Sequence, residues 1–123
     1  MQTDYDLVAS DYSSFNARDI DSVLRTMHKD VDWPNGMEGG RVSGHDGVRE
    51  YWIRQWSLLD PHVEPVSFTT DADGRTLVQV HQTVRDLSGK VILDQMVEHI
   101  YLIRKGLIQS MEIQSMEIRS GES

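Results

Sequence analysis

The chain has 123 residues, with 12 Lys and Arg against 20 Asp and Glu, which gives a formal net charge of −8. This balance argues against nucleic acid and anionic membranes as partners, because both attract basic surfaces. The absence of cysteine excludes disulfides, thiolate metal sites and a cysteine nucleophile. No signal segment or membrane-spanning apolar run is evident. We therefore expect one cytoplasmic domain over residues 1–123, with a core at about 5–113 and a tail at 114–123.

The first residues have the apolar spacing of a helix. Thr3 is suited to cap its start, since a threonine oxygen can accept from the first free backbone N–H groups. One stripe of this helix combines three apolar residues with a carboxylate: Val8, Asp11, Tyr12 and Phe15. An unpaired buried carboxylate is costly, so either Asp11 hydrogen-bonds inside the protein or the helix turns it toward water.

A second helix, a short strand and a third helix follow. Asp19 is suited to cap the second helix, whose buried face is expected to consist of Ile20, Val23, Leu24 and Met27. Residues 31–33 are expected to form a short strand that ends at Pro34, and the glycine-rich segment 36–44 is expected to be a loop. The third helix begins near His45 and is expected to end at Asp60-Pro61.

The second half alternates in the manner of strands. We expect them at about 63–70, 76–86, 91–104 and 107–113, joined by turns that contain glycine. Helices followed by an antiparallel meander indicate an α+β domain with the helices on one face of the sheet.

A pentapeptide, QSMEI, occurs at 109–113 and again at 114–118. Because five is odd and strand side chains alternate with a period of two, the second copy sends Met116 and Ile118 to the face opposite that of the first copy. We therefore expect the strand to end, bend or bulge near Gln114, with no function for the duplication.

Three segments carry a family resemblance: FNARDIDSVL (15–24), VDWPNG (31–36) with VSGHDGVREYW (42–52), and DQMVEHIYLI (94–103) running into GLIQSMEI (106–113). In this order they resemble the nuclear-transport-factor-2-like superfamily, which includes ketosteroid isomerase and SnoaL-like polyketide cyclases. The resemblance implies a cone-shaped, curved antiparallel sheet wrapped around three N-terminal helices, a cystatin-like α+β barrel with a deep apolar cavity. It also implies a homodimer through the convex face of the sheet.

The resemblance assigns three cavity positions by comparison with ketosteroid isomerase. Trp33 stands where the isomerase has its catalytic base, so a true ketosteroid isomerase is not expected. The oxyanion tyrosine of the first helix falls on Asp11, with Tyr12 one residue away. The protonated acid of the long strand, counted back from the hairpin glycine, falls on Glu98.

Glu98 is the leading catalytic candidate, because burial in an apolar strand would raise its pKa and suit a general acid. The alternatives are that this edge of the strand is exposed or that Glu98 forms a structural ion pair with Arg85. Asp94 shares the face of Glu98 and lies roughly 13 Å from it along the strand, so the two could flank one substrate.

The positions of His81 and Arg85 depend on the hairpin register. If Ser88-Gly89 is a two-residue turn, His81 faces Met96 and joins a polar cavity wall with Arg85. If residues 86–89 form a type I turn with a glycine bulge, the face flips, valines line the cavity and both residues point outward. Turn chemistry favours the second register, whereas comparison with the isomerase favours the first. We expect His81 in the cavity, as a proton shuttle.

The expected ligand-binding set is largely aromatic, because such side chains suit a wall that grips a flat apolar molecule. It consists of Trp33, Trp52, Trp56, Tyr12, Asp11, Met96 and Arg85. His99 has the opposite parity to Glu98 and is expected on the convex dimer face. The apolar patch of that face would consist of Val78, Val80, Val84, Val97, Tyr101 and Ile103.

The sequence thus predicts a cavity that binds a small hydrophobic molecule, with acid–base catalysis of cyclase, isomerase or hydrolase type by Glu98, Asp94 and His81. No cofactor and no metal are expected, since the five histidines are scattered and no phosphate-binding loop is present. The alternatives are a non-catalytic ligand carrier with the same cavity and a protein-interaction module whose cavity is filled by side chains.

Overall fold

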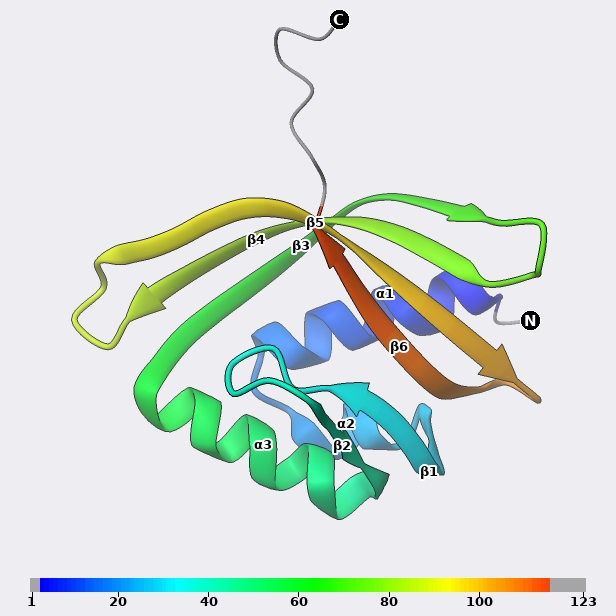
Figure 1. The fold of residues 1–123 in the computed structure, drawn as a ribbon, viewed down its shortest axis with the longest axis horizontal. Helices are drawn as coiled ribbons and strands as arrows, with labels where there is room; N and C mark the ends of the chain where they lie inside the picture. Colours follow the sequence, from blue (N-terminus) through cyan, green and yellow to red (C-terminus); the bar gives the residue numbers. More distant parts are fainter. Residues whose placement is uncertain (1–2, 116–123) are drawn as a thin grey trace, which may run out of the picture.

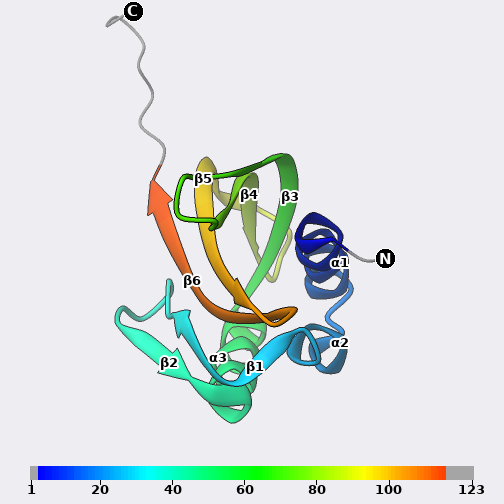
Figure 2. The same ribbon diagram turned by 90° about the vertical axis from the view of Figure 1, so that its right-hand side faces the viewer.

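The structure is a computed structural model and describes residues 3–115. Its helices are α1 (Asp4–Asn16), α2 (Ile20–Leu24) and α3 (Gly44–Leu58). Its strands are β1 (Met27–Pro34), β2 (Arg41–Ser43), β3 (Leu59–Thr70), β4 (Thr76–Asp86), β5 (Val91–Arg104) and β6 (Leu107–Ser115). They form one strongly curved sheet in the order β2-β1-β6-β5-β4-β3, with α1 and α3 on its inner side (Figure 1, Figure 2). The predicted α+β class is confirmed; β1 and β6 pair in parallel and the other neighbours are antiparallel.

The helix starts follow the sequence closely. Thr3 caps α1 in a reciprocal capping box with Asp6, and the Asp19 side chain accepts from the backbone N–H of Ser22 at the start of α2. These contacts satisfy backbone donors that have no partner inside the helix. Because α2 ends at Leu24, Met27 lies at the start of β1 and not on the helix face where the spacing placed it.

Two connections differ from the sequence prediction. Residues 36–44 contain a short strand, β2, which pairs with β1. Asp60-Pro61 does not interrupt the chain, because β3 begins at Leu59 and continues through Pro61 and Pro65. Proline is tolerated there because β3 is the edge of the sheet and one side of it needs no ladder of hydrogen bonds.

The β4–β5 hairpin combines features of both predicted registers. Its turn is the four-residue form: Gly89 has φ 96°, and the backbone N–H of Asp86 donates to the carbonyl of Lys90 at 2.9 Å. A second irregularity between Val84 and Arg85 then restores the register of a two-residue turn, so that His81 does face Met96. Of the two registers that the sequence left open, the strand pairing is that of the two-residue turn, whereas the turn itself is the four-residue form that the turn chemistry favoured.

The inner face of the hairpin is its valine face. The predicted convex patch instead forms the core: Val78, Val80, Val84, Val97 and Tyr101 are buried and Ile103 packs against them. The prediction that this row is an exposed dimer face was wrong. A half-buried strand turns its more apolar row inward, and in β4 that row is the valines.

The end of the chain is described as far as Ser115, the last residue of β6. Met116 and Ile118 of the second QSMEI copy lie outside the described residues, so the expected end or bend near Gln114 stays a prediction. Within residues 3–115, none of the helices is long and apolar enough to cross a membrane.

Candidate functional site

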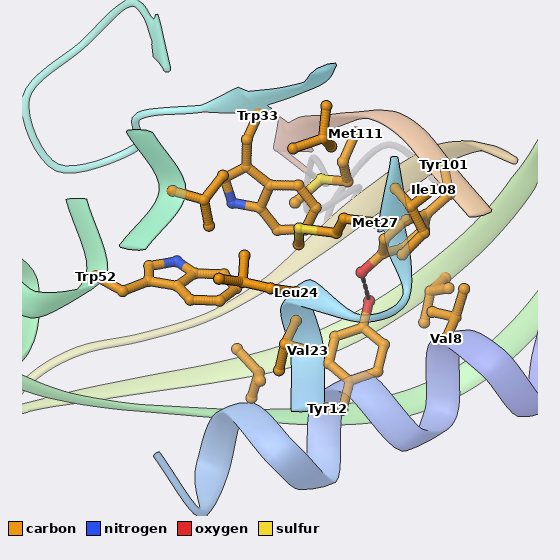
Figure 3. Packing of buried hydrophobic residues seen from close by; sticks show 14 of the residues in the cluster. Val8, Tyr12, Val23, Leu24, Met27, Trp33, Trp52, Tyr101, Ile108 and Met111 are labelled. Atoms are coloured by element: carbon orange, nitrogen blue, oxygen red, sulfur yellow. Dashed lines mark hydrogen bonds between the residues drawn. The ribbon is translucent and has the colours of Figure 1, made fainter. Parts of the chain in front are cut away.

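A cavity of about 330 Å³ opens between the inner face of the sheet and the helices. Its lining includes six aromatic side chains, which are Tyr12, Phe15, Trp33, Tyr51, Trp52 and Tyr101. Trp33 and Trp52 meet edge to face, with ring centroids 5.8 Å apart, and Tyr12 and Tyr101 lie opposite them (Figure 3). The space equals roughly eleven water molecules at about 30 Å³ each, enough for a small organic molecule.

Trp56 does not line this cavity, although the sequence placed it in the ligand-binding set. Its ring stacks on Trp52 with the ring centroids 5.8 Å apart, and the guanidinium carbon of Arg18 lies 5.0 Å from the centroid of the Trp56 ring. Trp56 therefore supports a wall residue from behind.

A directed chain of hydrogen bonds closes the buried end of the cavity. The Tyr101 hydroxyl donates to the Tyr12 oxygen at 2.9 Å, and Figure 3 shows the two hydroxyls facing each other. The single Tyr12 proton is then available for His99 Nδ1, 2.8 Å away. Because Nδ1 accepts, the neutral imidazole carries its proton on Nε2. This Nε2–H has no hydrogen-bond partner among the described residues, so it can donate to a molecule in the cavity.

Burial sets the charge of this chain of side chains. His99 is 7% exposed, and burial lowers its pKa from 6.5 to about 4, so the imidazole is neutral at neutral pH. Burial also raises the pKa of both Tyr12 and Tyr101, which keeps their hydroxyls protonated. The end of the cavity is therefore an uncharged hydrogen-bond donor and does not develop a positive charge of its own.

Asp11 is the acidic residue among those that line the cavity. It is 6% exposed, and burial raises its pKa from 3.8 to about 7, against the smaller opposing effect of its hydrogen bond to Thr26. Of the two alternatives that the sequence left open for Asp11, the structure shows the buried one, with a hydrogen-bond partner inside the protein. A carboxyl group with a pKa near neutrality can both accept and donate a proton.

The hydroxyl of Thr26 is the hydrogen-bond partner of Asp11 inside the protein. The Thr26 hydroxyl oxygen lies 2.9 and 2.8 Å from the two Asp11 oxygens and 2.6 Å from the carbonyl oxygen of Val23. One hydroxyl proton cannot serve three acceptors, so Thr26 donates either to the Asp11 carboxylate or to the carbonyl of Val23. Donation to the carboxylate favours the ionised form and opposes the larger effect of burial on the pKa of Asp11.

The leading catalytic candidates of the sequence lie on the outer face of the sheet. His81 and Asp94 do come together, with Nε2 and Oδ1 2.6 Å apart, but both side chains are about half exposed. Glu98 pairs with Gln79 on β4, in the outward row. None of the three lines the cavity. The prediction that they converge there was wrong about the face, and a side chain on the outer face cannot reach a molecule inside.

Two predicted binding residues share this outward row. Met96 stands opposite His81, and Arg85 follows Val84 in the direction of the turn. Neither lines the cavity. The error has one cause: counting from the hairpin glycine gave Glu98 the inward parity. The inward row of β5 is instead odd-numbered, from Leu93 and Gln95 to His99 and Tyr101.

His99 was accordingly assigned to the wrong face. It pairs with Val78, and it stands with the valines of β4 against the cavity. The signal that identifies it is the valine alternation of β4, because residues directly opposite each other in antiparallel strands share a face. Thr26, Gln82 and Gln95 were not singled out by the sequence and carry no motif that would have found them.

Within residues 3–115, no group of three His, Asp or Glu side chains is placed to hold a metal ion. The titratable groups that line the cavity are Asp11, His99 and the tyrosine hydroxyls, and the amides of Gln55, Gln82 and Gln95 line it as well.

Solved structures share this architecture. TerC, crystallized with polyporic acid, is 28% identical, with 91% of this chain and 90% of TerC covered and a TM-score of 0.79. An NTF2-like protein of unknown function from Burkholderia pseudomallei is 24% identical, with coverages of 94% and 92% and a TM-score of 0.81. The epoxide hydrolase/cyclase-like enzyme SalBIII, of pyran ring formation in salinomycin, is 16% identical, with coverages of 91% and 89% and a TM-score of 0.76.

No curated protein matches the chain significantly. The family model of the SnoaL-like domain matches residues 8–111, which is most of the chain. The fold was therefore predicted correctly from the three sequence segments, and the protein belongs to the family of SnoaL-like domains.

Proposed function

We propose that the cavity binds a small, mainly apolar carbonyl compound and transfers a proton at the carbon beside the carbonyl. The observation that carries this proposal is the buried carboxyl of Asp11 lining the same aromatic cavity as the neutral N–H donor of His99. The SnoaL-like fold is one that supports cyclase or isomerase chemistry and ligand binding.

The proposed step needs only side chains of this chain. Ionised Asp11 accepts a proton from the α-carbon, and the electron pair of the broken C–H bond moves to the carbonyl oxygen. The Nε2–H of His99 donates to this developing oxyanion, while Tyr12 and Tyr101 hold the imidazole in the tautomer that makes Nε2 a donor. Protonated Asp11 then returns the proton to carbon. The pKa of about 7 suits both halves of this cycle.

The test uses 2-tetralone, a fused bicyclic ketone, in D₂O. We expect the protein to accelerate exchange of the α-hydrogens, followed by proton NMR, over buffer alone. Asp11→Asn is expected to slow the protein-dependent exchange by about 10²-fold or more, within the range of general acid–base catalysis. Glu98→Gln, a matched change of a carboxylate on the outer face, is expected to leave it unchanged.

Two results would contradict the proposal. Hydrogen exchange that depends on Glu98 and not on Asp11 would indicate that the catalytic residues lie on the outer face of the sheet. Binding of 2-tetralone without any exchange would favour the non-catalytic carrier. An interaction module is not favoured, because side chains leave the 330 Å³ cavity open.

A further inference from the structure

The cavity has a second polar position, nearer its mouth. Gln82 of β4 and Gln95 of β5 stand directly opposite each other and both line the cavity. The Gln95 amide donates to the Gln82 oxygen at 3.1 Å. Within the described residues the pair makes no further side-chain hydrogen bond, so the Gln82 amide group can still donate and the Gln95 oxygen can still accept.

Gln95 lies on the same inward row of β5 as His99, four residues away. At about 3.3 Å per residue the two polar positions are roughly 13 Å apart, and strand side chains stand nearly perpendicular to the sheet. Val80 and Val97 fill the row between them with apolar surface. The inner face is thus polar, apolar and polar again.

A ligand that hydrogen-bonds to both positions has its two polar atoms about 7 to 13 Å apart. The short limit applies when both hydrogen bonds, of roughly 2.9 Å each, lie along the strand, and the long limit applies when they lie across it. Two or three fused rings span such a distance. The described residues that line the cavity include neither Lys nor Arg. A carboxylate or phosphate would therefore lose its hydration at the buried end, and part of its hydration at the Gln82–Gln95 pair, without gaining a cation.

We infer that the site selects an elongated, uncharged ring compound with one oxygen for His99 at the buried end and a second polar group for the Gln82–Gln95 pair near the mouth. This inference rests on the proposed function for the orientation of the ligand, with its carbonyl at the buried end. It adds the substrate class and a specificity-determining pair.

The test compares three related probes by calorimetry: 2-tetralone, 6-hydroxy-2-tetralone and the 6-carboxylate of 2-tetralone. The hydroxyl compound has oxygens at both ends of the bicycle and is expected to bind at least tenfold more tightly than 2-tetralone. The carboxylate is expected to bind more weakly than either. In the variant with Gln82→Met and Gln95→Met, the affinity ratio of hydroxyl compound to 2-tetralone is expected to fall to about one. Gln79→Met, on the outer face of β4, is the matched control and should keep the ratio.

The outcomes separate the two proposals. A ratio that survives in the double variant, or a carboxylate that binds best, would overturn the inference while Asp11-dependent exchange of 2-tetralone stands. A ratio that collapses in the double variant, with no exchange of 2-tetralone, would support the recognition pair and overturn the catalytic step. Failure of all three probes to bind would overturn both. Since the readout is a ratio of affinities within one variant, a general loss of folded protein does not imitate the expected result.

Discussion

Replacing Asp11 by Asn tests the buried carboxyl directly, because an amide of the same shape does not ionise. The pKa of Asp11 is 3.8 in the unfolded chain and about 7 in the folded protein. Between these values the folded state holds a proton that the unfolded state has released. The stability due to protonated Asp11 is therefore fully present below pH 3.8 and is lost as the pH rises toward 7.

The size of the effect follows from that interval. From 3.8 to about 7 is roughly 3 pH units, and each unit corresponds to about 1.36 kcal/mol. The whole interval corresponds to about 4 kcal/mol. Between pH 4 and pH 7 alone, Asp11→Asn is expected to gain about 3 kcal/mol in free energy of unfolding relative to the parent, because folded Asp11 is only half ionised at pH 7. Above pH 8 the difference should be constant, because Asp11 is then ionised in both states.

The assay is urea unfolding at pH 4, 5, 6, 7 and 8 in constant salt, followed by tryptophan fluorescence. Asp30→Asn, an exposed position on β1, controls for the change of one unit in net charge. A difference between Asp11→Asn and the parent that stays constant from pH 4 to pH 8 would refute the reasoning. It would show that burial does not hold the proton on Asp11.

Four further outcomes are expected. Burial lowers the pKa of His99 from 6.5 to about 4, so the stability due to the neutral imidazole is present above pH 6.5 and is lost as the pH falls. In urea unfolding, the free energy of unfolding of His99→Gln should therefore rise by about 3 kcal/mol relative to the parent between pH 6.5 and pH 4. Tyr12→Phe leaves two buried partners unpaired and should cost about 1–3 kcal/mol, more than Tyr101→Phe, which removes only the end donor; equal costs in urea unfolding would contradict this. Gly89→Ala, at φ 96°, should lower stability by about 1 kcal/mol in thermal unfolding. The homodimer stays a prediction, and light scattering at micromolar concentration should give twice 14.1 kDa; a mass of 14.1 kDa would refute it.

Local signals in the sequence predicted the elements well. The caps at Thr3 and Asp19 have short-range causes, since each side chain bonds a backbone N–H three residues away. The hairpin pairing that sets His81 opposite Met96 is one of the two registers that the sequence left open, and a compensating irregularity at Val84 and Arg85 produces it. Because two one-residue shifts cancel, the pairing matches a two-residue turn although the turn has four residues.

Counting residues from the hairpin glycine did not determine which face of the sheet points toward the cavity. β5 carries apolar residues in both rows, so its own alternation is ambiguous around Glu98 and His99. β4 is not ambiguous, because Val78 and Val80 alternate with Gln79 and His81. The alternation of β4 is therefore the better guide to which face points inward. Because residues directly opposite each other in antiparallel strands share a face, it places His99 of β5 inside. The contact between Thr26 and Asp11, 15 residues apart, depends on tertiary packing that no local pattern encodes.

The opposite pKa shifts of Asp11 and His99 have a joint consequence. Between about pH 4 and pH 6.5 the unfolded chain carries an ionised aspartate and a protonated histidine, whereas the folded protein holds both groups neutral. Folding thus leaves the number of bound protons from this pair nearly unchanged, and their contributions to the pH slope of stability cancel in the parent. In each single variant, the stability should depend on pH with the slope of the group that remains. In the variant with both Asp11→Asn and His99→Gln, this pH dependence should again be absent. The proposed step needs Asp11 to ionise before it accepts a proton from carbon, and a pKa of about 7 keeps its ionised and protonated forms close in free energy near neutral pH.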